Sequence, residues 1–180
     1  MNKIVLIGFR ATGKTSIGAS LAQKLNWKFL DLDEEIQKRT QKSIREIVEE
    51  EGWETFRSLE RKLLEEIKNL ENIVIALGGG SVLHQKEMSD LKQRSLVIWL
   101  WASKEIILER MKGDSKTLSQ RPSLTNFQTL EEEIEKLLKE REKLYNNFSH
   151  VKIDTSEKNI SEIVEEILAN FLKLGGGINE

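Results

Sequence analysis

Residues 4–15 read Ile-Val-Leu-Ile-Gly-Phe-Arg-Ala-Thr-Gly-Lys-Thr, an apolar run followed by a glycine-rich loop. A segment with a helical pattern, residues 16–25, comes directly after it. Four residues separate Gly8 from Gly13-Lys14-Thr15, and this spacing lets a tight turn aim successive backbone N–H groups at the oxygens of a polyphosphate. The order of strand, loop and helix therefore predicts a nucleotide-binding phosphate loop and not an incidental glycine-rich turn.

Two side chains of this loop predict part of its chemistry. Lys14 would reach the β- and γ-phosphates of a nucleotide, and the Thr15 hydroxyl would ligate Mg²⁺. The loop does not indicate which molecule receives a phosphoryl group. The nucleotide-binding positions that we predict here are Gly8, Ala11, Thr12, Gly13, Lys14, Thr15 and Ser16.

Composition narrows the classes of protein to consider. With 180 residues, 38% of them hydrophobic and 32% charged, the chain resembles a single soluble domain. The net charge of −2 argues against a general nucleic-acid or anionic-membrane surface, and the absence of cysteine excludes disulfides and thiolate chemistry. We see no signal peptide before the first strand, and the longest apolar run, residues 96–102, is too short to span a bilayer. We therefore expect a cytoplasmic protein.

Apolar segments rich in strand-forming residues alternate with amphipathic helical patterns along the chain. This alternation predicts an α/β fold with a parallel sheet, helices on both of its faces, and a ligand site at the carboxyl ends of the strands. Three of the segments are apolar throughout, as central strands covered on both faces must be. The predicted strands are residues 3–7, 28–30, 73–77, 96–101 and 151–153.

Several helix boundaries are also predicted. Ser43-Ile-Arg-Glu46 has the form of a capping box and opens a helical pattern that reaches Ile67, with a break near Gly52. Residues 129–147 and 159–174 form further helical patterns. Residues 78–84 and 111–127 look irregular, and the second stretch, which holds the only proline, Pro122, is interpreted as a flap. We expect residues 175–180 to form a frayed tail.

Two carboxylates follow the second predicted strand. If the chain is extended there, alternation points Asp31 and Asp33 to the same side, toward the phosphate loop. One carboxylate could then hold Mg²⁺, and the other could orient an attacking hydroxyl. The residues are equally compatible with a helix N-cap at Asp33.

A second constellation involves cations and glycines. Arg57 and Glu60, three residues apart, are typical of a surface ion pair, but Glu60 could instead hold the Arg57 guanidinium so that it meets a carboxylate. The run Gly78-Gly79-Gly80 removes side chains where a strand ends, so that a substrate could lie against bare backbone. Arg121 and Arg141, each taken singly, are more typical of solvent-exposed cations.

Taken together and in order, these motifs resemble the shikimate kinase family. The series runs from Gly8–Thr15 through Phe29-Leu-Asp-Leu-Asp33, Phe56-Arg-Ser-Leu-Glu60, Leu77-Gly-Gly-Gly80 and Arg121-Pro122 to the stretch Arg141-Glu-Lys-Leu-Tyr145. The resemblance implies a single kinase domain over residues 1–180. It also implies a three-layer α/β/α fold like that of nucleoside monophosphate kinases, with a five-stranded parallel sheet in the order 2-3-1-4-5. A substrate-binding section would cover residues 33–60 and a lid residues 111–124.

The resemblance also implies roles for individual residues. Asp33 would orient the acceptor hydroxyl as a base, Lys14 would stabilise the transferred phosphoryl group, and Arg121 would reach the ATP phosphates from the lid. Arg110 would pack over adenine, and Thr15 and Asp31 would serve Mg²⁺. The shikimate-binding set would be Asp33, Arg57, Gly78, Gly79, Gly80 and Arg141.

The chain departs from the family pattern at two loop positions. Ala11 stands where a glycine is common, and alanine is small enough to keep phosphate binding. Arg10 stands where an apolar or small residue is usual. We expect Arg10 to face solvent, with contact to a substrate as the alternative.

Three other functions fit the sequence less well. A GTPase would need an Asn-Lys-x-Asp sequence, which the chain lacks. An ATP-binding module without catalysis would have no use for Asp33, Arg57 and Arg141 together, and gluconate kinase is the second choice among enzymes. The expected reaction is transfer from ATP to the 3-hydroxyl of shikimate in the pathway to chorismate and aromatic amino acids. We expect a monomer that acts on these small molecules and binds neither nucleic acid nor membrane.

Overall fold

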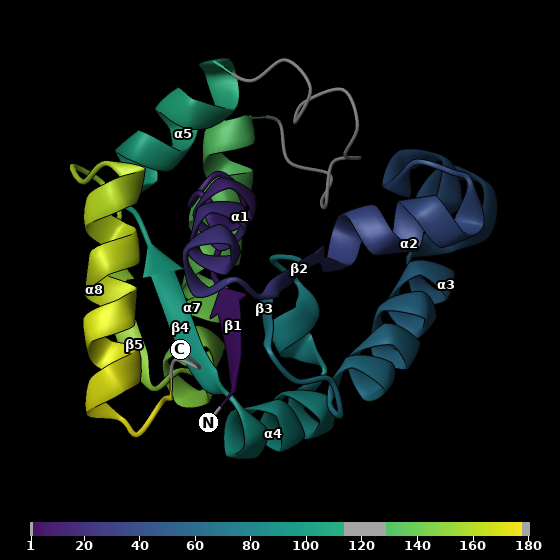
Figure 1. Cartoon of the computed structure of the whole chain (residues 1–180). Helices are drawn as coiled ribbons and strands as arrows, with labels where there is room; N and C mark the ends of the chain where they lie inside the picture. Colours follow the sequence, from purple (N-terminus) through teal and green to yellow (C-terminus); the bar gives the residue numbers. More distant parts are fainter. Residues whose placement is uncertain (1, 114–128, 178–180) are drawn as a thin grey trace.

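The computed structural model describes residues 2–113 and 129–177, and within them a parallel sheet forms the centre of the molecule (Figure 1). The strand order is β2-β3-β1-β4-β5, which confirms the predicted order. The strands are β1 (Lys3–Ile7), β2 (Lys28–Asp31), β3 (Ile73–Ala76), β4 (Leu96–Trp101) and β5 (Val151–Asp154).

The first strand occupies the middle of the sheet. Val5 lies opposite Ile75 of β3 on one side and Val97 of β4 on the other, and all five residues of β1 are buried. Burial on both faces explains why this strand is apolar throughout, as the sequence pattern predicted. The phosphate loop, which follows β1, is therefore anchored at the centre of the carboxyl edge of the sheet.

Helices cover both faces of the sheet. On one face α1 (Lys14–Leu25) and α8 (Ile160–Lys173) pack on Ile4 and Leu6, and on the other α3 (Ile44–Ile67), α4 (Gln85–Arg94) and α7 (Leu130–Phe148) pack on Val5 and Ile7. The side chains of β1 alternate between these two clusters because successive residues of a strand point to opposite faces. The predicted three-layer arrangement is thus confirmed. Within the described residues, no helix is long and apolar enough to cross a membrane.

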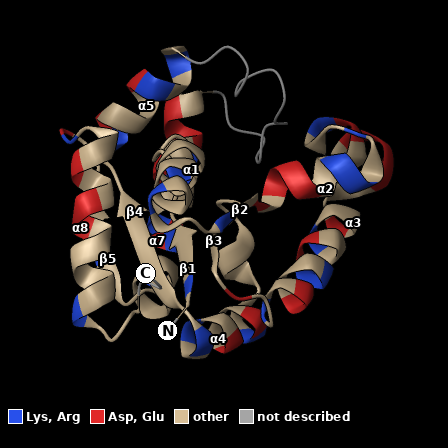
Figure 2. Ribbon diagram, in the orientation of Figure 1, with Lys and Arg blue, Asp and Glu red and all other residues tan. Residues whose placement is uncertain are grey.

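Two shorter helices complete the frame of the site. The helix α2 (Leu32–Thr40) follows β2 and leads into α3, and both extend outward beyond the edge of the sheet (Figure 1, right). The helix α5 (Lys104–Gly113) follows β4, and a short 3₁₀ turn, η1 (Ser81–Leu83), precedes α4. Segments of acidic and basic residues are interspersed along α3 and α4 (Figure 2), in keeping with the small net charge.

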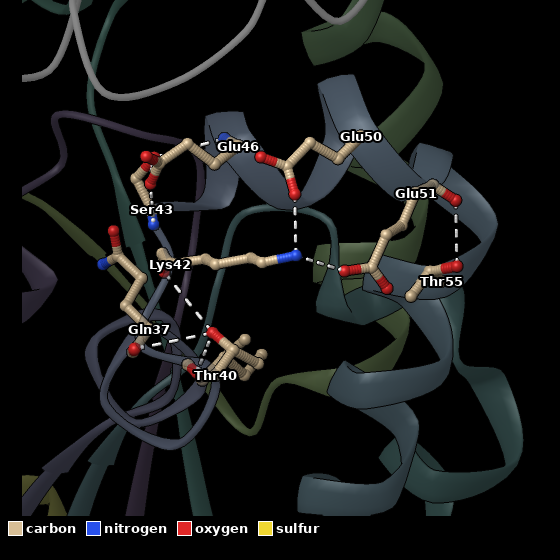
Figure 3. Close-up of polar contacts among 9 residues, drawn as sticks. Gln37, Thr40, Lys42, Ser43, Glu46, Glu50, Glu51 and Thr55 are labelled. Carbon is tan, nitrogen blue, oxygen red and sulfur yellow. Dashed lines mark hydrogen bonds and ion pairs between the residues drawn. The ribbon is translucent and has the colours of Figure 1, made fainter.

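The start of α3 follows the predicted capping box. Ser43 and Glu46 exchange hydrogen bonds between side chain and backbone, and the helix then bends at Gly52, whose φ of 85° and ψ of 165° are not helical. Lys42, just before the cap, lies between Glu50 and Glu51, with its Nζ 2.7 and 2.8 Å from their carboxylates (Figure 3). Hydrogen bonds to Glu50 and then to Glu51 raise the pKa of Lys42. The connection between α2 and α3 is therefore held to the part of α3 that precedes the bend.

The structure corrects two predictions about irregular segments. Residues 111–113 are the last residues of α5, and the rest of the predicted flap, with Arg121 and Pro122, lies outside the described residues. The first residues of the predicted frayed tail cap α8 instead: Gly175 has a φ of 84°, and the N–H of Gly176 donates to the carbonyl of Phe171 at 2.8 Å. Glycine adopts this left-handed conformation without steric cost, which lets the chain turn back onto the last helical turn.

Candidate active site

The phosphate loop joins β1 to α1 in a conformation set by close backbone contacts. A Cβ atom at Gly8 would collide with the carbonyl oxygen of Leu100 in β4, so only glycine fits there. Ala11 takes a left-handed conformation, with a φ of 62°, and the Thr12 hydroxyl donates to the carbonyl of Phe9 at 2.8 Å. The first residue of α1 is Lys14, so the N-terminus of the helix opens directly onto the loop.

The two reactive side chains of the loop have defined partners. The Lys14 Nζ donates to the carbonyls of Gly8 (2.9 Å) and Phe9 (2.6 Å), across the mouth of the loop. The Thr15 hydroxyl donates to Oδ2 of Asp31 at 2.6 Å, which brings the two predicted Mg²⁺ positions together. No cluster of three or more His, Cys, Asp or Glu side chains suited to a metal occurs in residues 2–113 and 129–177. A hydroxyl and one carboxylate nevertheless suit Mg²⁺, which prefers oxygen ligands and keeps several waters.

The two aspartates after β2 are arranged differently from the prediction. Because α2 begins at Leu32, the segment from Asp31 to Asp33 is not extended. Asp31 is the N-cap: its Oδ1 accepts from the N–H groups of Asp33 (3.1 Å) and Glu34 (3.2 Å). The alternative of an N-cap at Asp33 is therefore wrong by two residues. Asp33 lies in the first turn of α2 and is buried.

A pocket opens beside the phosphate loop. Its wall combines the loop, α2, α3, the segment after β3, and α7. It holds every predicted substrate-binding position, and also Arg10, for which contact with a substrate was the alternative prediction. Three further side chains were not singled out for it by the sequence: Ile44, Trp53 and Phe56. The full lining is Arg10, Asp33, Ile44, Trp53, Phe56, Arg57, Glu60, Gly78, Gly79, Gly80 and Arg141.

Glu60 anchors one side of this pocket. Its side chain is 1% exposed and receives hydrogen bonds from Arg57 and from the Ser81 hydroxyl (2.8 Å to Oε1), and its Oε2 lies 3.1 Å from Nε2 of His84. Burial acts to raise the pKa of Glu60, but the hydrogen bond from His84, the charge of Arg57 and the bonds from Arg57 and Ser81 together lower it. Glu60 is thus a buried carboxylate that stays ionised, and the alternative of a surface ion pair is wrong.

The guanidinium of Arg57 lies close to two aromatic rings and to Gly80. Its Cζ lies 5.5 Å from the ring centre of Trp53 and 5.3 Å from that of Phe56, and a Cβ atom at Gly80 would collide with it. A Cβ at Gly78 would likewise lie 2.6 Å from Oδ1 of Asp33. The glycine run is therefore needed first to make room for two side chains of the protein, a reason that the sequence did not suggest.

Arg141 reaches the pocket from α7. It is 6% exposed and so is not the solvent-facing cation that it would be if taken singly. Tyr145, one turn further on, donates its hydroxyl to the carbonyl of Gly79 at 2.6 Å and stacks on Trp99. Burial raises the pKa of Tyr145 to about 12, so its hydroxyl remains a donor at neutral pH. This bond holds α7, and with it Arg141, against the glycine run.

Arg10 lines the same pocket, and the expectation that it faces solvent is wrong. Its side chain is 10% exposed, and its Nη2 lies 3.8 Å from Oε1 of Glu133, which is itself buried at the start of α7. The partner is 123 residues away in the sequence, so no local pattern could have revealed it. Arg10 adds a third cation to the pocket.

The sequence and structure of this chain are similar to those of known shikimate kinases. The shikimate kinase family model matches residues 10–172. The shikimate kinase of Syntrophus aciditrophicus is 41% identical, over 93% of this chain and 90% of that protein, and that of Caldanaerobacter subterraneus is 40% identical over 98% and 99%. The chain belongs to the shikimate kinase family. Its structure resembles that of shikimate kinase from Acinetobacter baumannii in complex with shikimate, with a TM-score of 0.89 and 32% identity over 97% and 95% of the two chains.

Other solved structures share only the architecture. A gluconokinase from Sinorhizobium meliloti is 18% identical with a TM-score of 0.61, a level at which only the fold is comparable. The family match therefore favours shikimate kinase over the gluconate kinase alternative.

Arg110, another predicted position of the family pattern, also contacts the phosphate loop. Its guanidinium donates to the carbonyl of Thr155 (2.6 Å), to the Thr155 hydroxyl (3.2 Å) and to the carbonyl of Ala11 (3.2 Å). Arg110 thus ties the loop to the segment after β5. Arg121 lies outside the described residues, as does most of the predicted lid.

Proposed function

We propose that this chain transfers the γ-phosphoryl group of ATP to the 3-hydroxyl of shikimate, giving ADP and shikimate 3-phosphate, at the pocket beside the phosphate loop. Membership of the shikimate kinase family supports the reaction. The observation that carries the assignment of the site is the convergence of Asp33, Arg57 and Arg141 on one pocket next to Gly8–Thr15. The product would enter the pathway to chorismate and aromatic amino acids.

Arg57 and Arg141 would bind the carboxylate of shikimate. Guanidinium groups present parallel N–H donors that match a carboxylate, and charge-assisted bonds of this kind are about twice as strong as neutral ones. Arg57 approaches from α3 and Arg141 from α7, so the two cations can hold the acid from two sides. Buried positions reduce solvent screening and strengthen the attraction.

Asp33 would orient the acceptor hydroxyl. It is buried, lies against Gly78 and is two residues from Asp31, which contacts Thr15 of the phosphate loop. A carboxylate between the phosphate loop and the pocket would be able to accept the proton of the attacking hydroxyl. Phosphoryl transfer needs positioning and charge stabilisation more than covalent participation of the protein.

Lys14 would stabilise the transferred phosphoryl group. Its ammonium contacts two carbonyls at the mouth of the loop, a position from which phosphate oxygens can replace those carbonyls as partners. Thr15 and Asp31 would hold Mg²⁺, and Mg²⁺, when bound, supplies positive charge to the β- and γ-phosphate oxygens. Arg110 would lie by the adenine, and Arg121 would reach the phosphates from a lid that excludes water. We further propose that the protein acts as a cytoplasmic monomer.

A coupled assay of ADP release tests this function. The protein is incubated with ATP and Mg²⁺ and with shikimate, gluconate or no acceptor. We expect release only with shikimate, and mass spectrometry should detect a product heavier than shikimate by one phosphoryl group. ADP release that is equally fast without an acceptor would contradict a kinase function, and stimulation by gluconate alone would favour the second enzyme class.

A further inference from the structure

His84 is a buried side chain to which the proposed reaction assigns no role. The side chain is 4% exposed, and the residue lies between η1 and α4. The backbone N–H of His84 donates to the carbonyl of Ser81 (3.1 Å), and its backbone carbonyl accepts from the N–H of Met88 (2.9 Å). Hydrogen bonds on both sides therefore fix the backbone that carries the ring. Its Nε2 lies 3.1 Å from Oε2 of Glu60.

The hydrogen on this nitrogen can be inferred. Hydrogen bonds and the charge of Arg57 keep the pKa of Glu60 low, so its carboxylate is ionised and can only accept. The Nε2 of His84 must then carry the proton and donate. His84 and Arg57 thus share one oxygen, Oε2, while Ser81 binds the other, Oε1.

This sharing affects the cation that faces the substrate. If Arg57 were the only donor at Oε2, this fully buried carboxylate would draw the guanidinium toward itself and compensate most of the charge of Arg57. The bond from His84 disperses part of the charge of Glu60, which leaves more of the field of Arg57 for an anion in the pocket. It also fixes the carboxylate, and the carboxylate fixes the guanidinium.

We propose that His84 is a positioning residue for the carboxylate clamp: through Glu60 it sets the orientation and effective charge of Arg57, and so the affinity for the acid substrate. The inference rests on the proposed function, because it concerns the same pocket. His84 itself lies outside the lining of that pocket. An ordinary buried histidine would affect stability alone, whereas a positioning residue affects binding of one substrate and not of the other.

The test compares two variants, His84→Gln and His84→Asn, whose amide side chains differ in length. In His84→Gln the side-chain nitrogen can occupy the place of Nε2, whereas in His84→Asn the amide is too short to meet Oε2. We expect His84→Asn and His84→Ala to raise the KM for shikimate about 5- to 20-fold, consistent with the loss of one hydrogen bond to a charged group. The kcat and the KM for ATP should change less than about twofold, and His84→Gln should restore most of the affinity.

His150 provides the matched control, since it is the other histidine of the chain. It accepts a hydrogen bond from the N–H of Val97, at the amino edge of the sheet and away from the pocket. His150→Gln should leave both KM values unchanged. Titration calorimetry with shikimate gives a binding measurement that does not depend on turnover.

The outcomes separate this inference from the proposed function. If the wild-type protein shows no shikimate-dependent ADP release, the proposed function itself fails. If the wild type is active but the Asn and Ala variants keep its KM for shikimate, only the inference is overturned. It is also overturned if kcat falls as much as KM rises, if Gln gives no rescue, or if neither the Asn nor the Ala variant folds, because His84 would then be a purely structural residue.

Discussion

The two halves of the site are built in different ways. The phosphate half is a continuous stretch, Gly8–Thr15, whose binding groups are backbone N–H groups and two side chains. The acceptor half collects side chains from the phosphate loop, α2, α3, the segment after β3, and α7, which span residues 10–141. The first half needs one strand, one turn and one helix, whereas the second needs the whole fold.

This difference predicts how each half responds to change. Backbone donors survive most side-chain substitutions, so we expect phosphate binding to tolerate Ala11 and Arg10 in the loop. In the acceptor half Arg57 is held by Glu60, and Glu60 is held in turn by His84 and Ser81. Substitutions there should weaken the acceptor without affecting the nucleotide.

The largest effect is expected at Asp33, between the two halves. Asp33→Asn keeps the size of the side chain but removes the acceptor of the hydroxyl proton, so kcat should fall about 10²- to 10⁴-fold. The affinity for ATP, measured by fluorescence titration with a nucleotide analogue, should stay within twofold. An unchanged kcat would exclude Asp33 as the group that orients the acceptor.

Removal of the Arg57 side chain should show the difference between the two halves most clearly, because it should affect shikimate and not ATP. Arg57→Ala should raise the KM for shikimate about 10- to 100-fold, the loss expected for charge-assisted hydrogen bonds, while the KM for ATP changes little. Steady-state kinetics with each substrate varied in turn measures both values. A parallel increase in the two KM values would indicate general damage to the fold, and unaltered shikimate affinity would remove Arg57 from the clamp.

The buried carboxylate of Glu60 should make stability depend on pH. Its pKa in the folded protein lies below its ordinary value of 4.5, so its contribution is fully present above pH 4.5 and is lost as the pH falls through the folded pKa. Glu60→Gln should therefore cost about 2 kcal/mol at pH 7 and much less in acid. Urea unfolding from pH 3 to 7 measures this, and parallel pH curves for variant and wild type would contradict it.

The smallest effect is expected at helix caps away from the chemistry. Ser43→Ala removes the capping box of α3 and Asn159→Ala that of α8, and each should cost about 1 kcal/mol of unfolding free energy. Neither should change kcat by more than about twofold. Thermal unfolding and the ADP assay, run on both variants, would show whether the α2–α3 connection tolerates weakening as well as α8 does. A marked rise in the KM for shikimate in Ser43→Ala alone would show that it does not.

Local patterns predicted much of the fold. The order of strands, the three layers, the capping box at Ser43 and the bend at Gly52 all follow from periodicity, caps and the family resemblance, and each is confirmed. The start of α2 was the main local miss: the sequence allowed either an extended segment from Asp31 to Asp33 or an N-cap at Asp33, but Asp31 caps a helix that begins one residue later. An N-cap side chain accepts hydrogen bonds from the backbone N–H groups of the residues that follow it. The Asp-Leu-Asp sequence is compatible both with a cap at the first aspartate and with a cap at the second.

What the sequence determined by itself is the phosphate loop, because a strand, a glycine turn and a helix N-terminus are local structures whose spacing is written in eight consecutive residues. It also supplied, through the family resemblance, the six predicted substrate-binding residues that meet at the acceptor pocket. Only the tertiary structure decided how these side chains are held: that Arg10 turns to Glu133, that Glu60 is buried under His84 and Ser81, and that Gly78 and Gly80 clear space for Asp33 and Arg57. Burial and distant partners arise from packing, and packing joins residues that no local pattern relates.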